Sequence, residues 1–468
     1  MILDPQRTFS PEPGQRAVAV ELYKSAAYLP ILSPHGHVDA SIFVDPDFCF
    51  PNPAEMLVIP DHYILRILHS QGVPYEKLGI LRKDARPVKT DPRSIWQVFA
   101  ANYFLFNGTP TGMWLEYELA KVFGVTLKLN AETAQTIYDQ VSEKIGDPEF
   151  NPCRLYERFG IEVLCTTNAS TDTLEDHQAL RASTWRGHIL PTFRPDDVVD
   201  LYAPGWRNSI ERLALVSGIE VVDYASFIHA LEQRRAFFKS LGATATDQAA
   251  VSADTTPLPA NEAEAIFQRA LKGNASSNDA SRFTASMLTE MARISVEDGL
   301  VMQLHIGAFR NHDRKLFDDH GPNLGADFPV QVEFTNSLRP LLNLFGNTPG
   351  FNLILFTLDE TSLARELAPM ASYYPALKLG APWWFLDSLN GMRNYFDHVV
   401  GICGIHNTAG FNDDTRAFPS IPARHDLWRR ACANWLAGLV RRGTLSVPDA
   451  QEMMFELAVG LARKAYKL

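Results

Sequence analysis

The stretch LPILSPHGH (residues 29–37) decides the fold expected of this chain. An apolar run leads directly into His35-Gly36-His37, the pattern of a short buried strand that ends in two histidines. Side chains alternate along a strand with period two, so both imidazoles point to the same side and can hold one metal ion. Paired histidines also occur by chance on protein surfaces. A strand of this kind near the start of a long chain is, however, typical of barrel metalloenzymes, whose sites lie at the carboxyl ends of the strands.

The rest of the chain supports an α/β fold of this type. Short β-rich runs recur along the sequence, and helical patterns separate most of them. Eight such runs predict a (β/α)8 TIM-type barrel, distorted where the runs are weak in β-formers. The runs are residues 29–36, 161–167, 187–193, 241–247, 300–307, 351–358, 376–384 and 399–405.

A long helical segment separates the first two β-rich runs. Residues 91–106, 113–123 and 131–144 have helical patterns, so we expect a helical insertion after strand one that covers the barrel mouth. The expected organisation has three parts. They are an N-terminal segment with the first strand (1–84), the helical insertion (85–160) and the remainder of the barrel with a C-terminal helix (161–468).

Composition excludes several classes of partner. The net charge of −11 over 468 residues argues against binding to nucleic acid or to an anionic membrane surface. We find no apolar run of membrane-spanning length and no basic-then-apolar leader at the start. Five scattered cysteines without a CxxC motif fit a reduced, cytoplasmic compartment. A small anionic substrate is still compatible with this charge, provided that cations gather locally around its site.

Polar and aromatic side chains follow the expected strand ends repeatedly. Each has a structural alternative: His305 could be a hydrogen-bonded core histidine, Arg194 could pair with the following helix, and Asp414 with Arg416 could form a surface ion pair. Their recurrence after six of the eight runs favours a site. The candidates are His35, His37, Arg194, Asp247, His305, Trp383, Trp384, Asp414 and Arg416, with His62 and Tyr63 at the start of a helical pattern.

The residue types predict a catalytic metal centre. Two imidazoles and one carboxylate with an open position are typical of catalytic zinc. Strands one and eight are neighbours in a closed barrel, so Asp414 can reach an ion held by His35 and His37. We expect one divalent ion, Zn²⁺ by ligand type, with Mn²⁺ or Fe²⁺ as alternatives. The adjacent Asp413 is the alternative carboxylate.

A series of motifs in a fixed order is similar to one known family. The motifs are Pro-Ile-x-x-x-His-x-His (30–37), Asp-His-Tyr (61–63), Thr-Thr…Leu-Glu-Asp-His (166–177), Pro-Thr-Phe-Arg-Pro-Asp (191–196), Thr-Asp (246–247), His-Ile-Gly-Ala-Phe-Arg-Asn (305–311), Pro-Trp-Trp-Phe-Leu-Asp (382–387), Asp-Thr-Arg (414–416) and Arg-His-Asp-Leu-Trp-Arg-Arg (424–430). On these motifs the chain resembles the uronate isomerase (glucuronate isomerase) family of the amidohydrolase superfamily. Two departures exist: Asn168-Ala169-Ser170 replaces the usual Asp-Asp-Pro, and Asp247-Gln248-Ala249 replaces Asp-His-Gly.

The resemblance implies an aldose–ketose isomerase. It would interconvert D-glucuronate with D-fructuronate, and D-galacturonate with D-tagaturonate, by moving a proton from C2 to C1 through a cis-enediol. It implies Asp414 as the base, Tyr63 as the proton shuttle between O1 and O2, and Arg416 as the group that stabilises the enediolate. It also implies a homo-oligomer.

The remaining candidates have substrate-binding roles by the same resemblance. His62 and Arg194 would hold the substrate carboxylate, His305 and Asp247 would orient hydroxyls, and Trp383 or Trp384 would pack on the sugar. The alternatives are a mononuclear metal-dependent lactonase or amidohydrolase of the same superfamily and a non-catalytic sugar-acid-binding barrel.

Overall fold

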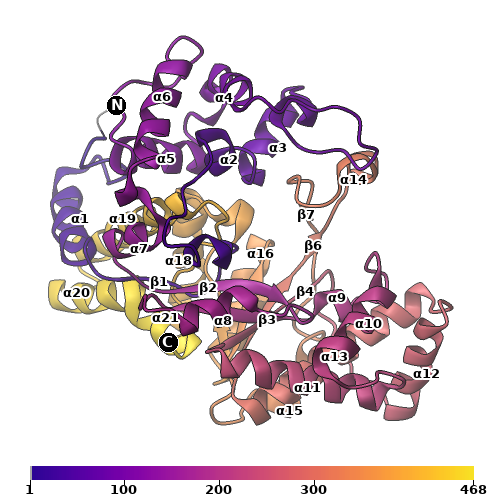
Figure 1. The fold of residues 1–468 in the computed structure, drawn as a ribbon. Helices are drawn as coiled ribbons and strands as arrows, with labels where there is room; N and C mark the ends of the chain where they lie inside the picture. Colours follow the sequence, from indigo (N-terminus) through magenta and orange to yellow (C-terminus); the bar gives the residue numbers. More distant parts are fainter. Residues whose placement is uncertain (1–2) are drawn as a thin grey trace.

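The structure, a computed structural model, describes residues 3–468. Its centre is a curled sheet of seven parallel strands in the order β1-β2-β3-β4-β5-β8-β9 (Figure 1). A separate antiparallel pair, β6 with β7, lies outside this sheet. The strands are β1 (Ile31–Ser33), β2 (Ile161–Ala169), β3 (Ile189–Arg194), β4 (Ala245–Ala250), β5 (Val301–Ile306), β6 (Ala308–Phe309), β7 (Phe328–Pro329), β8 (Leu353–Thr357) and β9 (Leu377–Leu379).

Helices precede, connect and follow these strands. Those before β2 are α1 (Pro13–Ala26), α2 (Pro53–Leu57), α3 (His62–Ser70), α4 (Pro92–Ala101), α5 (Pro110–Tyr117), the π-helix η4 (Glu118–Val122), α6 (Ala134–Ile145) and α7 (Pro152–Arg158). Between β2 and β8 lie α8 (Glu175–Ala182), α9 (Asp196–Val199), α10 (Trp206–Ser217), α11 (Tyr224–Ser240), α12 (Ala260–Leu271), α13 (Ser277–Asp298), α14 (Arg314–His320) and α15 (Arg339–Phe345). The last are α16 (Glu360–Ser362), α17 (Ala368–Ala371), α18 (Leu389–Cys403), α19 (Ile421–Arg441), α20 (Val447–Phe455), the π-helix η10 (Glu456–Gly460) and α21 (Leu461–Tyr466).

The α/β class is confirmed, and seven of the eight predicted runs overlap a strand of the sheet. The eighth, residues 399–405, is wrong as a strand because most of it is the end of α18. Its Val-Val-Gly-Ile stretch is rich in β-formers, but Met392, Tyr395, Phe396 and Val399 are buried at helical spacing. Beside β9 the chain makes only an isolated parallel bridge, between Leu379 and Thr408.

Alternation along the strands places polar residues inside the curl of the sheet. On β5, Val301 packs in the interior cluster with Ile354 and Phe356 of β8, whereas Leu304 packs in the outer core beneath the helices. Asp247 and His305 share the inward parity of Val301. Both side chains therefore reach the interior near the carboxyl ends of their strands.

The C-terminal helix closes the opposite end of this interior. Tyr466 of α21 is 1% exposed and packs in one cluster with Ala245, Val301 and Ile354. The expected C-terminal helix corresponds to α20, η10 and α21. With one end filled by side chains, a ligand can reach the interior only from the carboxyl ends of the strands.

Two further parts border the open end. Helices α2 to α7 follow β1 and supply most of a second hydrophobic core, which also includes Ile31 of β1 and Leu164 of β2. The arm formed by β6, α14 and β7 extends from the sheet toward α3 (Figure 1). Tyr75 Oη donates to the Leu324 carbonyl at 2.9 Å, and Lys83 N donates to the Asp319 carbonyl at 2.8 Å. Across residues 3–468, none of the helices combines the length and apolarity needed to span a bilayer.

Candidate active site

His35 and His37 stand just beyond the end of β1. Their ring centroids are 5.3 Å apart, with the planes at 82°. The His35 side chain is 3% exposed and the His37 side chain 26% exposed. The intervening Gly36 carbonyl accepts a hydrogen bond from Thr167 Oγ1 at 2.9 Å, which ties this turn to β2.

Asp414 reaches these histidines from the segment that follows the Thr408 bridge. This segment pairs with the β1 extension: His37 N donates to the Thr415 carbonyl at 2.9 Å, and Asp414 N donates to the His35 carbonyl at 3.3 Å. Asp414 Oδ1 lies 3.1 Å from His37 Nε2 and 3.5 Å from His35 Nε2. The Asp414 backbone has a φ of +41°, a strained conformation of the kind found at functional sites.

These three side chains fit a divalent metal ion. One ligand atom from each lies within 4.8 Å of the other two. Trp383 Nε1 donates to Asp414 Oδ2 at 3.0 Å, whereas Asp414 Oδ1 is buried and accepts no hydrogen bond from residues 3–468. Burial alone would raise the pKa of Asp414, but His35 and His37 lower it well below its usual value. The group thus supplies two imidazoles and an ionised carboxylate, the ligand set of an open catalytic site.

A second polar cluster lies deeper in the interior. His305 Nδ1 is 2.7 Å from Asp247 Oδ1, and Arg194 Nε is 3.5 Å from Asp247 Oδ2. Burial opposes ionisation of Asp247, but Arg194 and His305 lower its pKa. Arg194 Nε also donates to Asp196 Oδ2 at 2.8 Å. His35, Asp247 and His305 form a second group whose ligand atoms lie within 4.8 Å of one another.

A cavity of about 220 Å³ brings most of the predicted residues together. Three arginines face it, Arg194, Arg310 and Arg416, so the cavity suits a small anion. Arg416 donates to Asn323 Oδ1 at 2.9 Å. The lining comprises His35, His37, His62, Arg194, His305, Arg310, Asn323, Gly325, Asp327, Trp383, Trp384, Asp414 and Arg416.

Two predicted residues are not part of this lining. Asp247 is fully buried beneath His305 and Arg194. Tyr63 is 5% exposed and packs against His62 at 4.6 Å between ring centroids and edge-on against Trp114 at 5.6 Å. Asp61 caps the start of α3, because its side chain accepts from Tyr63 N at 2.8 Å.

Sequence reasoning missed four lining residues, Arg310, Asn323, Gly325 and Asp327. All come from the arm formed by β6, α14 and β7. Asp327 Oδ1 accepts from Asn311 N at 2.7 Å and Asp327 Oδ2 lies 3.7 Å from Arg310 NH1. Arg310 stands within the 305–311 motif and could have been found there. Asn323 and Asp327 lie in a connection whose return to the site no local pattern indicates.

The comparisons with known proteins agree with this geometry. The family model described as Glucuronate isomerase matches residues 14–466. The chain belongs to the glucuronate isomerase family. The uronate isomerase of Nostoc punctiforme is 52% identical over 467 residues, covering 100% of this chain and 98% of that protein.

Solved structures of the glucuronate isomerase family have the same fold. The glucuronate isomerase of Caulobacter crescentus has a TM-score of 0.97 at 43% identity and covers 100% of this chain and 97% of its own. The uronate isomerase of Thermotoga maritima has a TM-score of 0.92 at 27% identity, with 100% of both chains covered. Membership confirms the prediction of an isomerase and disfavours the hydrolase alternative.

The two departures from the family motifs fall outside the cavity. Asn168 Oδ1 accepts from Thr166 Oγ1 at 2.6 Å, and Asn168 Nδ2 donates to Asp172 Oδ2 at 2.9 Å. The Gln248 side chain points to the opposite face of β4 from Asp247. Its amide donates to Thr246 Oγ1 at 2.9 Å. Neither residue lines the cavity, so this family member keeps the site surface despite both changes.

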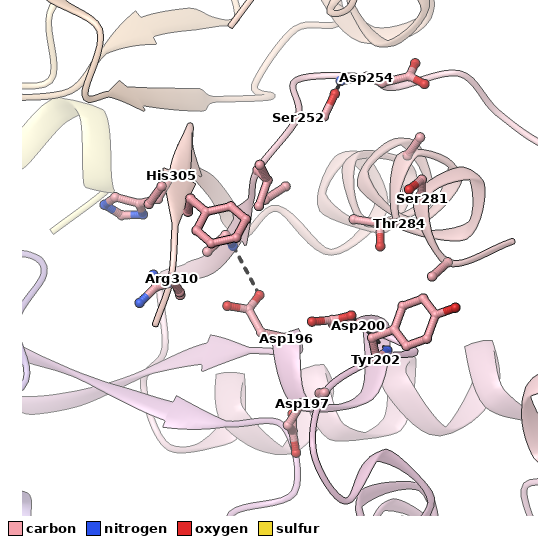
Figure 2. Close-up of a pocket in the computed structure, with 18 of the residues that line it drawn as sticks. Asp196, Asp197, Asp200, Tyr202, Ser252, Asp254, Ser281, Thr284, His305 and Arg310 are labelled. Carbon is pink, nitrogen blue, oxygen red and sulfur yellow. Dashed lines mark hydrogen bonds between the residues drawn. The ribbon is translucent and has the colours of Figure 1, made fainter. Parts of the chain in front are cut away.

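A larger cavity of about 640 Å³ adjoins the site, and His305 and Arg310 line both (Figure 2). Figure 2 shows Asp196 and Asp200 on one side of this space and Ser281 and Thr284 of α13 on the other. Its lining includes four carboxylates, those of Asp196, Asp197, Asp200 and Asp254, and one cation, Arg310. An anionic ligand is therefore repelled from the larger cavity and attracted to the arginines of the smaller one.

Proposed function

We propose that this glucuronate isomerase family member interconverts D-glucuronate with D-fructuronate and D-galacturonate with D-tagaturonate. The observation that carries the proposal is the His35, His37 and Asp414 group in one small cavity with Arg194 and Arg416. The volume of about 220 Å³ suits a single sugar acid, and the arginines offer bidentate partners for its carboxylate.

A divalent ion, for which we propose Zn²⁺, would be held by His35, His37 and Asp414. When bound, it would supply Lewis-acid polarisation of substrate oxygens and lower the pKa of a substrate hydroxyl. Trp383 orients Asp414 through its hydrogen bond to Oδ2.

The proton transfers are assigned to side chains of this chain. Asp414 removes the proton from C2 of the aldose, and Tyr63 gives a proton to O1, which yields the cis-enediol. Tyr63 then takes the proton from O2 while Asp414 returns its proton to C1, which yields the ketose and restores both residues. Arg416 stabilises the negative charge that develops on the enediolate oxygens.

The other predicted residues bind and orient the substrate. His62 and Arg194 hold the carboxylate, and burial lowers the pKa of His62 well below its usual value, so His62 binds as a neutral imidazole. His305, fixed by Asp247, orients a hydroxyl group. Trp383 and Trp384 line the cavity and pack against the apolar face of the sugar.

The finer organisation of the molecule is part of the same proposal. The curled sheet would be a distorted (β/α)8 barrel whose eighth position is the Thr408 segment, with residues 85–160 as the helical insertion after strand one. We also propose a cytoplasmic homo-oligomer whose partner is the small sugar acid, not nucleic acid or a membrane. The cation-lined cavity inside a chain of net charge −11 supports that choice of partner.

Incubation of the purified, Zn²⁺-loaded protein with D-glucuronate in D₂O tests the function. We expect the ketose to form. The C1 methylene of the product should carry deuterium in each turnover in which the proton on the Asp414 carboxyl exchanges with solvent before it is transferred to C1. Proton NMR follows both signals, and the same incubation with D-galacturonate tests the second substrate. Hydrolysis of a lactone without ketose formation would instead establish the hydrolase alternative.

A further inference from the structure

Two of the sequence motifs contribute buried, charged side chains that the proposed reaction leaves without a role. They are Asp387, which ends the 382–387 motif, and Arg424, which begins the 424–430 motif. Arg424 is 2% exposed and Asp387 is 5% exposed. Arg424 NH1 donates to Asp387 Oδ2 at 3.3 Å. A buried ion pair is costly to desolvate and adds little stability on average, so its presence here invites a functional explanation.

The guanidinium of Arg424 packs directly on the surroundings of Tyr63. Its Cζ lies 3.8 Å from the ring centroid of Trp114 and 5.1 Å from that of Tyr63. The Tyr63 ring meets Trp114 edge-on, so the three groups are in mutual contact. The Tyr63 ring therefore cannot change its tilt unless the guanidinium also moves. Burial raises the pKa of Tyr63, and the charge of Arg424 opposes that rise.

The same guanidinium also contacts the segment that carries Asp414. Arg424 NH1 donates to the Asp413 carbonyl at 3.0 Å, one residue before Asp414. The Asp387 segment carries Trp383, whose indole holds Asp414 Oδ2. One buried cation thus connects the start of α3, the segment after β9 and the segment that reaches back to β1.

We propose that Arg424, held by Asp387, is a positioning residue for uronate isomerisation. It fixes the Tyr63 ring relative to the Asp414 segment. The proton shuttle Tyr63 and the base Asp414 are therefore both positioned to act at C1 and C2 of the substrate. This inference rests on the proposed function, because it assigns Arg424 an effect only through Tyr63. Displacement of a reacting group by about 1 Å costs about 100-fold in rate, which sets the size of the expected effect.

The first test compares Arg424→Met with Arg235→Met in the full-length, Zn²⁺-loaded enzyme. Arg235 is a matched control, because it is fully buried and paired with Asp298 at 2.7 Å on the helical side of the molecule. Both variants lose a buried cation and leave a carboxylate without its partner, so both should melt earlier. Only Arg424→Met should lower kcat, by about 100-fold. Its KM should change by less than about threefold and its zinc content should stay at that of the parent, because no substrate-binding group and no metal ligand is replaced.

A double-mutant cycle with Tyr63→Phe separates positioning from general damage. Once the Tyr63 hydroxyl is absent, loss of Arg424 should have no further effect on kcat, so Tyr63→Phe and the double variant should be equally slow. Arg424→Lys keeps the charge beside Asp387 and should recover about tenfold of the lost kcat. If Arg424→Met does not fold, Arg424→Lys takes its place in the double-mutant cycle with Tyr63→Phe.

Each result of the cycle has one meaning. Three results would overturn the inference. The first is that Arg424→Met lowers kcat equally in the parent and in Tyr63→Phe. The others are an unchanged kcat in Arg424→Met and a loss of zinc from Arg424→Met. Full turnover by Tyr63→Phe alone would instead remove Tyr63 from the proposed function. A slow Tyr63→Phe with an additive cycle would leave the proposed function standing and reject only the role of Arg424.

Discussion

Asp413 and Asp414 are neighbours in sequence but lie in different surroundings. Asp414 faces His35 and His37, whereas Asp413 Oδ2 lies 3.1 Å from His425 Nε2 in α19. Of the two residues, Asp414 has a positive φ, of +41°. Sequence spacing alone left both carboxylates open as ligands, and the backbone geometry is what separates them.

We predict opposite results for the two isosteric amides at these positions. Asp414→Asn replaces an anionic ligand and the proposed base by a neutral group, so kcat should fall about 10⁴-fold and bound zinc should be lost. Asp413→Asn can keep a hydrogen bond to His425, so it should retain zinc and most of its turnover. Metal analysis and steady-state kinetics check both variants. Zinc retained in Asp414→Asn and lost in Asp413→Asn would reverse the assignment.

At the scale of elements, the eighth position of the sheet depends on a close approach between backbones. Gly410 follows the Thr408 bridge with a φ of +73°, and a Cβ there would lie 2.7 Å from Ala462 N in α21. A side chain would therefore strain the backbone and push on the helix that closes the interior. The contact between Gly410 and α21 is thus found near the position where the sequence pattern predicted an eighth strand, residues 399–405.

We predict that Gly410→Ala lowers the free energy of unfolding by about 3 kcal/mol, from the strained φ and the clash together. The matched control is Gly218→Ala at the end of α10, where φ is +70° and no atom lies within 4 Å of the added Cβ. That variant should cost only about 1 kcal/mol. Urea denaturation of both proteins measures the difference, and equal costs would show that the approach to α21 is not restrictive.

The elements that sequence reasoning found are those with a strong local pattern. The runs that became β2, β5 and β8 are long and apolar. Because the sites of such barrels lie at the carboxyl ends of the strands, His305 of β5 and Asp247 at the end of the weaker β4 run could both be assigned to the site. The Thr408 position could not be found, because an isolated bridge has no periodicity. Asn323 and Asp327 could not be found either, because only tertiary contacts such as Tyr75 with the Leu324 carbonyl bring their arm to the site.

At the scale of the whole molecule, a buried acid lies where the N-terminal helices meet the C-terminal half. Glu118 of η4 is 2% exposed, and burial raises its pKa to about 8. Ser420 and Arg424 lower this pKa and Asp61 raises it, but burial dominates. The unfolded value is about 4.3, so the folded protein holds a proton near neutral pH that the unfolded chain has released. The stability that this proton provides is complete below about pH 4 and is lost as the pH rises through about 8.

We predict that Glu118→Gln removes this pH dependence. The variant and the parent should have similar stability below about pH 4, and the variant should gain as the pH rises, by up to about 5 kcal/mol at pH 9. The difference between the two proteins cancels contributions from other titrating groups. Chemical denaturation at several pH values gives this difference directly. A difference that stays constant from pH 5 to pH 9 would mean that Glu118 is ionised in the folded protein.

We propose that one metal ion joins the end of β1 to the segment before α19. Anomalous scattering from a crystal soaked in Zn²⁺ tests it most directly. We predict one peak about 2.0–2.2 Å from a nitrogen of His35, a nitrogen of His37 and Asp414 Oδ1. A peak among His35, Asp247 and His305 instead, or no peak near His37, would mean that His35, His37 and Asp414 do not hold the ion.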